Sequence, residues 1–183
     1  MRVFWAAAMS VALMSGAAFA CQPDPLPEYP SPEIGESAEA YAARIEAIRA
    51  EERAIRERSW ISQQQSWWDD SEFVFIARVE RVGAVRLDFG ETPRAHLRPV
   101  QWLKGEGRSR RFSVNHEGWT SCGPFGRGGD AASGEVGETF VVFARQSPLR
   151  LENLITAVPP SAITHPDILA LLPAQASASV EAP

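Results

Sequence analysis

Cysteine and histidine are scarce in this chain of 183 residues, which contains two cysteines and three histidines. No two histidines have the HxxxH or HxxEH spacing that places two metal ligands on one helix face, so no metal site formed by this chain alone is expected. The sequence also lacks the P-loop, dinucleotide-binding and Gly-x-Ser-x-Gly fingerprints. These absences give no sign of nucleotide or serine-hydrolase chemistry, and no cofactor is predicted.

Basic residues are too few to make the chain positive. The 18 lysines and arginines stand against 23 acidic residues, for a formal net charge of −5. Contacts to phosphates dominate the affinity of nucleic-acid-binding proteins, so an acidic chain is not expected to have a nucleic-acid partner. Beyond the first residues, no apolar run approaches the roughly 20 residues that a membrane-spanning helix needs. No transmembrane segment is therefore predicted in the mature chain.

The first 20 residues have the pattern of an export signal. Arg2 supplies the positive start, residues 3–13 are apolar, and residues 18–20 form a small-x-small cleavage site directly before Cys21. Cleavage there would make Cys21 the first residue of a periplasmic or extracellular protein. The alternatives are an uncleaved anchor and a cell-envelope protein lipidated on Cys21. Lipidation signals usually carry a larger aliphatic residue where this chain has Ala18.

An oxidising destination favours a disulfide between the two cysteines, Cys21 and Cys122. The competing hypothesis is a thiol-dependent exported enzyme in which Cys122 is the nucleophile and His116 is the base. A second cysteine that could quench the thiol argues against such an enzyme. The chain is therefore predicted not to be an enzyme.

The composition divides the exported chain into four segments. Residues 21–36 are rich in proline and are predicted to form an extended lead-in. Residues 37–70 are predicted to be helical, with Ser37 as the N-cap and a tryptophan-rich end that enters the core. Residues 71–172 are predicted to form a β domain that closes with a short helix. Residues 173–183 are small and polar, and are predicted to be a disordered tail.

Five strands are expected in the β domain, at residues 73–82, 94–103, 110–116, 140–144 and 154–158. Pro99 indicates an edge or a bulge in the second strand, and the glycine-rich residues 117–137 are expected to form a loop. Five short strands separated by turns are typical of a small barrel or sandwich. Six apolar residues of these strands are expected to share one core: Phe73, Phe75, Trp102, Val114, Val141 and Phe143.

Four motifs occur in a characteristic order: FVFIARV at 73–79, VQWLKG at 100–105, SCGPF at 121–125 and GETFVVFA at 137–144. Together with Cys21, this order resembles the netrin-module and TIMP-like family, named for the tissue inhibitors of metalloproteinases. Members are secreted OB-fold barrels whose mature N-terminal cysteine is bonded to a later one. The resemblance implies a divergent, bacterial-type member. Its fold would be mainly β, a small five-stranded OB-fold-like barrel with an added N-terminal helical segment and a short C-terminal helix.

The resemblance also implies a function. In the inhibitors, the amine and carbonyl of the N-terminal cysteine chelate the catalytic zinc of a target protease. Carried over to this chain, Cys21 would be the chelator, Gln22 would enter the specificity pocket, and Cys122 would hold this segment through the disulfide. The predicted function is an exported binding module with a protein partner, and a zinc metalloprotease is the partner class that the resemblance implies.

Overall fold

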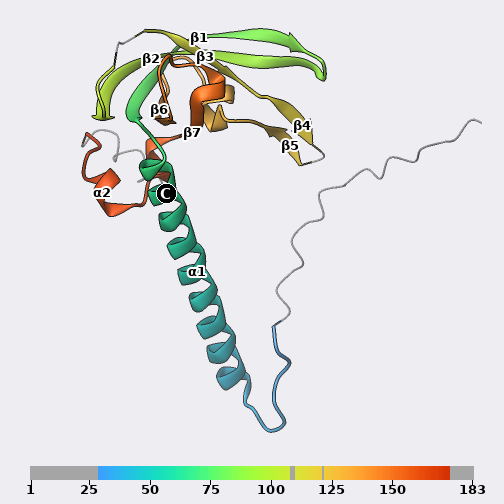
Figure 1. Ribbon diagram of the computed structural model, residues 1–183. Helices are drawn as coiled ribbons and strands as arrows, with labels where there is room; N and C mark the ends of the chain where they lie inside the picture. Colours follow the sequence, from blue (N-terminus) through green and yellow to red (C-terminus); the bar gives the residue numbers. More distant parts are fainter. Residues whose placement is uncertain (1–28, 108–109, 121, 174–183) are drawn as a thin grey trace, which may run out of the picture.

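The computed structural model describes residues 29–107, 110–120 and 122–173. A long helix, α1 (Ala38–Asp69), leads into a five-stranded antiparallel sheet, and a short helix, α2 (Pro166–Leu169), follows the last strand (Figure 1). The prediction of a mainly β fold with an N-terminal helix and a short C-terminal helix is confirmed. The predicted export signal, Cys21, Gln22 and all but the first residue of the predicted tail lie outside the described residues.

Helix α1 begins at the predicted N-cap, where the Ser37 hydroxyl accepts a hydrogen bond from the Ala40 N–H at 3.2 Å. It continues for 32 residues because neither glycine nor proline interrupts it. The described part of the lead-in is tied to the helix by Arg44, which donates to both carboxylate oxygens of Glu36 at 3.0 and 2.7 Å. These hydrogen bonds lower the pKa of Glu36 to about 2.

The sheet contains strands in the order β3-β2-β1-β6-β7. Their bounds are as follows: β1 (Phe73–Leu87), β2 (Gly90–Lys104), β3 (Phe112–Asn115), β6 (Thr139–Ala144) and β7 (Leu154–Val158). Within the described residues no ladder joins the edge strands β3 and β7, so the sheet is not a closed barrel. The short 3-10 helix η1 (Gly129–Ser133) contacts both edge strands and fills the space between them.

The first two strands are longer than predicted. The sequence indicated that the first strand would end near Gly83, yet β1 continues to Leu87 and pairs with β2 from Gly90 onward. Val85 and Leu87 continue the apolar alternation past Gly83, and Gly83 lies inside the ladder, paired with Arg94, rather than at a strand end. Pro99 faces a shift of register between Ile76 and Ala77, so the predicted irregularity is confirmed.

The prediction of one shared core is wrong, because the central strands bury both of their faces. Phe140 and Val142 of β6 join Phe75 and Val114 in an inner cluster, on which Phe73 and Trp102 pack. Val141 and Phe143 point to the opposite face of the sheet and pack with Val74, Ile76 and Ile168. Successive side chains in a strand alternate between faces. The continuous apolar run of β6 therefore marks a strand covered on both sides.

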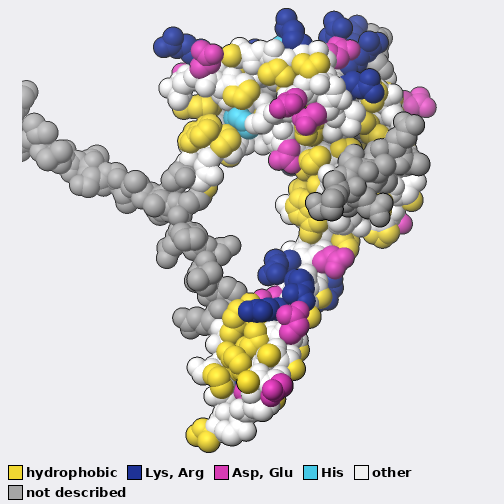
Figure 2. All heavy atoms as spheres, turned by 180° about the vertical axis from the view of Figure 1, so that it is seen from behind, with side chains coloured by type: hydrophobic (Ala, Val, Ile, Leu, Met, Phe, Trp, Pro, Cys, Tyr) yellow, Lys and Arg dark blue, Asp and Glu magenta, His cyan; other side chains and the backbone are white. Residues whose placement is uncertain are grey.

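Helix α1 covers the outer face of the sheet with its last turns only. Trp67 and Trp68 pack against the outer cluster, and the Trp60 indole N–H donates to the Ala162 carbonyl at 2.9 Å. The rest of α1 extends away from the sheet, as both views of the molecule show (Figures 1 and 2). Ile55 in this extended part is 51% exposed.

Candidate functional site

The predicted partner-binding residues Cys21 and Gln22 lie outside the described residues, and only Cys122 can be placed. It lies at the exposed turn of a two-stranded ribbon formed by β4 (Gly118–Thr120) and β5 (Gly123–Phe125). Cys122 is not a free thiol in the structure. Its pairing with Cys21 remains a prediction.

The β4–β5 ribbon was not predicted from the sequence, which indicated a loop there. Its register pairs Gly118 with Phe125 and Trp119 with Pro124. Paired residues share a face, so Trp119 and Phe125 project from opposite faces of the ribbon. Their side chains are 61% and 53% exposed. A ribbon that carries an exposed aromatic ring on each face can contact a partner on both sides at once.

Local contacts hold the ribbon in shape. The Phe125 ring lies against Gly118, where a Cβ atom would collide with the ring in its present position. The Glu117 N–H donates to the Phe125 carbonyl at 2.8 Å, and the Glu117 carboxylate accepts from the Arg127 N–H at 2.6 Å. At the turn, the Cys122 N–H donates to the Thr120 hydroxyl at 3.2 Å. Gly118 and Gly123, two of the glycines that suggested a loop, therefore belong to an ordered hairpin.

His116, the candidate base of the thiol-enzyme hypothesis, is buried beside η1. Its Nε2 atom lies 2.9 Å from the Ser133 hydroxyl, and only 7% of the residue is exposed. Thiol catalysis needs an available thiolate next to the base. Since Cys122 is not a free thiol, the geometry gives the thiol-enzyme hypothesis no support.

His96 on β2 faces the Arg81 guanidinium rather than a carboxylate. The Nε2 atom of His96 lies 3.1 Å from an Arg81 nitrogen, and the Nδ1 atom lies 2.8 Å from the Ser113 hydroxyl. A guanidinium can only donate, so Nε2 accepts and the ring proton is on Nδ1. Burial lowers the pKa of His96, and the charges of Arg81 and Arg94 lower it further.

We expect His96 to titrate below the ordinary histidine value of about 6.5. The folded state favours the neutral His96 ring, so His96 contributes to the free energy of unfolding above the ordinary histidine pKa. This contribution decreases as the pH falls through the pKa of His96 in the folded state. Imidazole NMR shifts followed against pH measure the pKa directly. Arg81→Gln should raise it towards the ordinary value, while Arg86→Gln, further along the hairpin, should leave it unchanged. A His96 pKa at or above the ordinary value would contradict this assignment.

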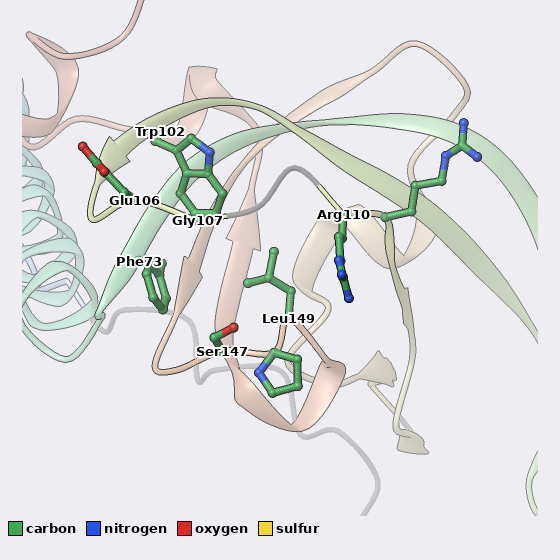
Figure 3. A pocket seen from close by; sticks show the side chains of 9 residues that line it. Phe73, Trp102, Glu106, Gly107, Arg110, Ser147 and Leu149 are labelled. Atoms are coloured by element: carbon green, nitrogen blue, oxygen red, sulfur yellow. The ribbon is translucent and has the colours of Figure 1, made fainter.

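A concave region lies at the end of the sheet where β2 leads towards β3. Phe73, Trp102 and Leu149 form its apolar walls, Arg110 and Ser147 lie at its sides, and its volume is about 450 Å³ (Figure 3). Ligand pockets typically measure about 300 to 1,000 Å³, so this cavity could admit a small molecule or one side chain of a partner.

The WLKG motif of the sequence builds one wall of this cavity. Trp102 packs on Phe75 with ring centroids 4.8 Å apart. The Lys104 ammonium donates to the Trp68 carbonyl at 2.6 Å and so ties the end of β2 to α1. Gly105 has a φ of +70°, and a Cβ atom there would press into Phe73 and the Glu72 carbonyl. The motif therefore shapes the fold at this end of the sheet.

Arginine side chains gather along the rim formed by β1 and β2, although the chain as a whole is acidic (Figure 2). Arg78 and Arg98 occupy directly opposed positions on the two strands. Glu80 forms ion pairs with Arg98 and Arg111, and the hydrogen bond from Arg111 lowers the pKa of Glu80. Net charge alone gave no indication of this basic rim.

No protein-family model, curated protein or solved structure matches this chain. Within the described residues, histidine, cysteine and acidic side chains form no group of three or more that could hold a metal ion. In the same part of the chain, no helix is both long and apolar enough to span a membrane.

Proposed function

We propose that this protein is an exported binding module of the netrin/TIMP-like type that contacts a protein partner through the β4–β5 ribbon and the N-terminal residues Cys21 and Gln22. The observation that carries the proposal is the exposure of Trp119 and Phe125 on opposite faces of an ordered ribbon that contains Cys122. Exposed aromatic residues are enriched at protein interfaces, because they bury much surface at little cost in conformational entropy.

The strand order supports an OB-fold-like domain. A five-stranded OB-fold is a partly open barrel, and unrolled it has the order 3-2-1-4-5. When β6 and β7 are counted as the fourth and fifth strands, the order β3-β2-β1-β6-β7 corresponds to it. Helix η1 bridges the two edge strands where the barrel would close. This agreement concerns topology, so it supports the fold assignment more directly than the function.

The position of Cys122 supports a role for the N-terminus at the same surface. A Cys21–Cys122 disulfide would fix the first residues of the mature chain beside Trp119 and Phe125. The free α-amine and carbonyl of Cys21 could then fill open positions on a zinc ion held by three ligands of a partner protease. The extended part of α1 projects away from the sheet, which leaves the ribbon open to a partner. A lipidated cell-envelope protein anchored through Cys21 is the alternative, and in that case the amine would be blocked.

We expect Trp119→Ser to weaken partner binding about tenfold or more, because exposed tryptophans at interface centres often contribute at least about 2 kcal/mol. The measurement is inhibition of a panel of zinc metalloproteases by the mature exported protein. Val136→Ser is the matched control, because Val136 is 66% exposed and lies outside the ribbon. Equal inhibition by the two variants would show that the ribbon is not part of the interface.

The chelation step is tested separately by adding one residue before Cys21. A peptide bond at the amine removes its ability to donate to zinc, so we expect inhibition to be lost while the circular dichroism spectrum stays unchanged. Mass spectrometry of the exported protein reports the cleavage site, lipidation and disulfide of the starting material. Absence of inhibition at micromolar concentration, or inhibition unaffected by the extension, would exclude a metalloprotease inhibitor that acts through Cys21.

A further inference from the structure

We propose that the cavity between Phe73, Trp102 and Leu149 binds an amphiphilic carboxylate. Such a ligand has an aromatic or branched apolar body and one carboxylate group, which would pair with the Arg110 guanidinium. This site lies at the opposite end of β3 from the ribbon and does not depend on the function proposed for the ribbon.

The apolar part of the cavity fits a flat or branched group. Phe73 and Trp102 meet edge to face with centroids 6.0 Å apart, and both rings remain partly accessible. Leu149 lies across from them, between Phe73 and Arg110 (Figure 3). Aromatic walls of this kind favour ligands with their own π-system or branched methyl groups. The volume of about 450 Å³ suits a ligand the size of a single capped amino acid.

Two hydrogen-bond donors at this cavity have no partner within the described residues. The Arg110 guanidinium forms no ion pair or hydrogen bond there, whereas its neighbour Arg111 is paired with Glu80. The Trp102 indole N–H likewise donates to no group in the described part of the chain. Arginine is suited to carboxylates because its planar fork can donate two parallel hydrogen bonds.

The acidic residue at the cavity does not cancel this charge. Figure 3 shows the Glu106 carboxylate turned away from the cavity, while the Arg110 side chain runs beside Leu149. Arg110 is exposed beside these apolar walls, so its attraction for an anion should weaken as the salt concentration rises. The combination selects a ligand that has a carboxylate and an apolar body, and it disfavours cations and uncharged polar molecules.

Isothermal titration of the mature protein with N-acetyl-phenylalanine tests the proposal. We expect measurable binding to the acid and at least tenfold weaker binding to N-acetyl-phenylalaninamide, which has the same body without the charge. A pentapeptide that ends in phenylalanine forms a second arm. Tighter binding of this peptide than of the capped amino acid would identify a peptide C-terminus as the source of the carboxylate.

Variants locate the site. Arg110→Gln should weaken binding of the acid about tenfold and leave binding of the amide unchanged, while Arg86→Gln, an exposed arginine on the hairpin, should change neither. Ser147→Asp places a carboxylate at the exposed rim and should also weaken binding of the acid, whereas the isosteric Ser147→Asn should not. Arg110 and Ser147 are both exposed, so these substitutions should not affect folding. Equal affinity for acid and amide, no binding at millimolar concentration, or full affinity in Arg110→Gln would overturn the proposal.

Discussion

Replacing Phe75 with alanine is expected to lower the free energy of unfolding by about 3 to 5 kcal/mol, the usual range for a large aromatic residue removed from a core. Phe75 is fully buried in the inner cluster. Its ring packs against Trp102 and Phe112, with centroids 4.8 and 5.8 Å away. Truncation would leave a cavity between rings of three strands that cannot close without moving the sheet. Denaturant unfolding followed by tryptophan fluorescence measures the loss.

Phe89→Ala is the matched control for this experiment. Phe89 lies at the turn of the β1–β2 hairpin and is 40% exposed. The same chemical change there should alter stability by less than about 1 kcal/mol. A loss below about 1 kcal/mol for Phe75→Ala would show that its ring is not enclosed, and the inner cluster would then be wrong.

The second large effect is expected for Gln64→Leu, which should lower the free energy of unfolding by about 2 to 4 kcal/mol. Gln64 is a fully buried polar residue on α1. Its side-chain oxygen accepts hydrogen bonds from the backbone N–H groups of Thr164 and His165, both at 2.9 Å, and its nitrogen donates to the Ala162 carbonyl at 3.0 Å. Leucine has a similar volume but would leave the buried His165 N–H and the part-buried Thr164 N–H without this acceptor. A fully buried donor without a partner costs about 1 to 3 kcal/mol, and a part-buried one costs less.

The neighbouring glutamine provides the control. Gln63 precedes Gln64 in the same helix and is exposed, so Gln63→Leu should change stability by less than about 0.5 kcal/mol. Both variants add the same apolar surface to the same helix, and only one removes the connection to the C-terminal segment. Equal stability of the two variants would contradict the role of Gln64 in holding α1 on the sheet.

The two candidate sites make different demands on the fold. The β4–β5 ribbon is a projecting structure, and its value for binding depends on exposed aromatic rings held by a tight hairpin. The cavity beside Trp102 is a recess whose walls also belong to the inner cluster. A substitution at Trp119 should therefore affect binding alone, while a substitution at Trp102 would disturb stability as well. For this reason Arg110 and Ser147 are better probes of the cavity than its aromatic walls.

Local chemistry along the chain was sufficient to predict the main elements. Ser37 marks the start of α1 because its hydroxyl can cap the first free N–H groups, and the alanine-rich segment after it favours helix. Alternating and continuous apolar runs located the strands that became β1, β6 and β7. Pro99 indicated an irregular strand because proline cannot donate to a ladder. Each of these signals depends on neighbours in sequence, so each could be recognised without the fold.

Long-range contacts decided the rest. A continuous apolar run does not indicate which of its residues face which side of a sheet. The elements that cover each face decide that Val142, and not Val141, faces the inner cluster. Gln64 is one of three consecutive glutamines. It is buried and hydrogen-bonded only because residues about 100 positions later in the chain pack against it. The ribbon at Trp119 and the cavity at Trp102 likewise form where separate segments meet. The sequence by itself was enough to predict α1 and the approximate positions of the five strands of the sheet. Tertiary packing decided which surfaces remain available for binding, because exposure depends on segments distant in the chain.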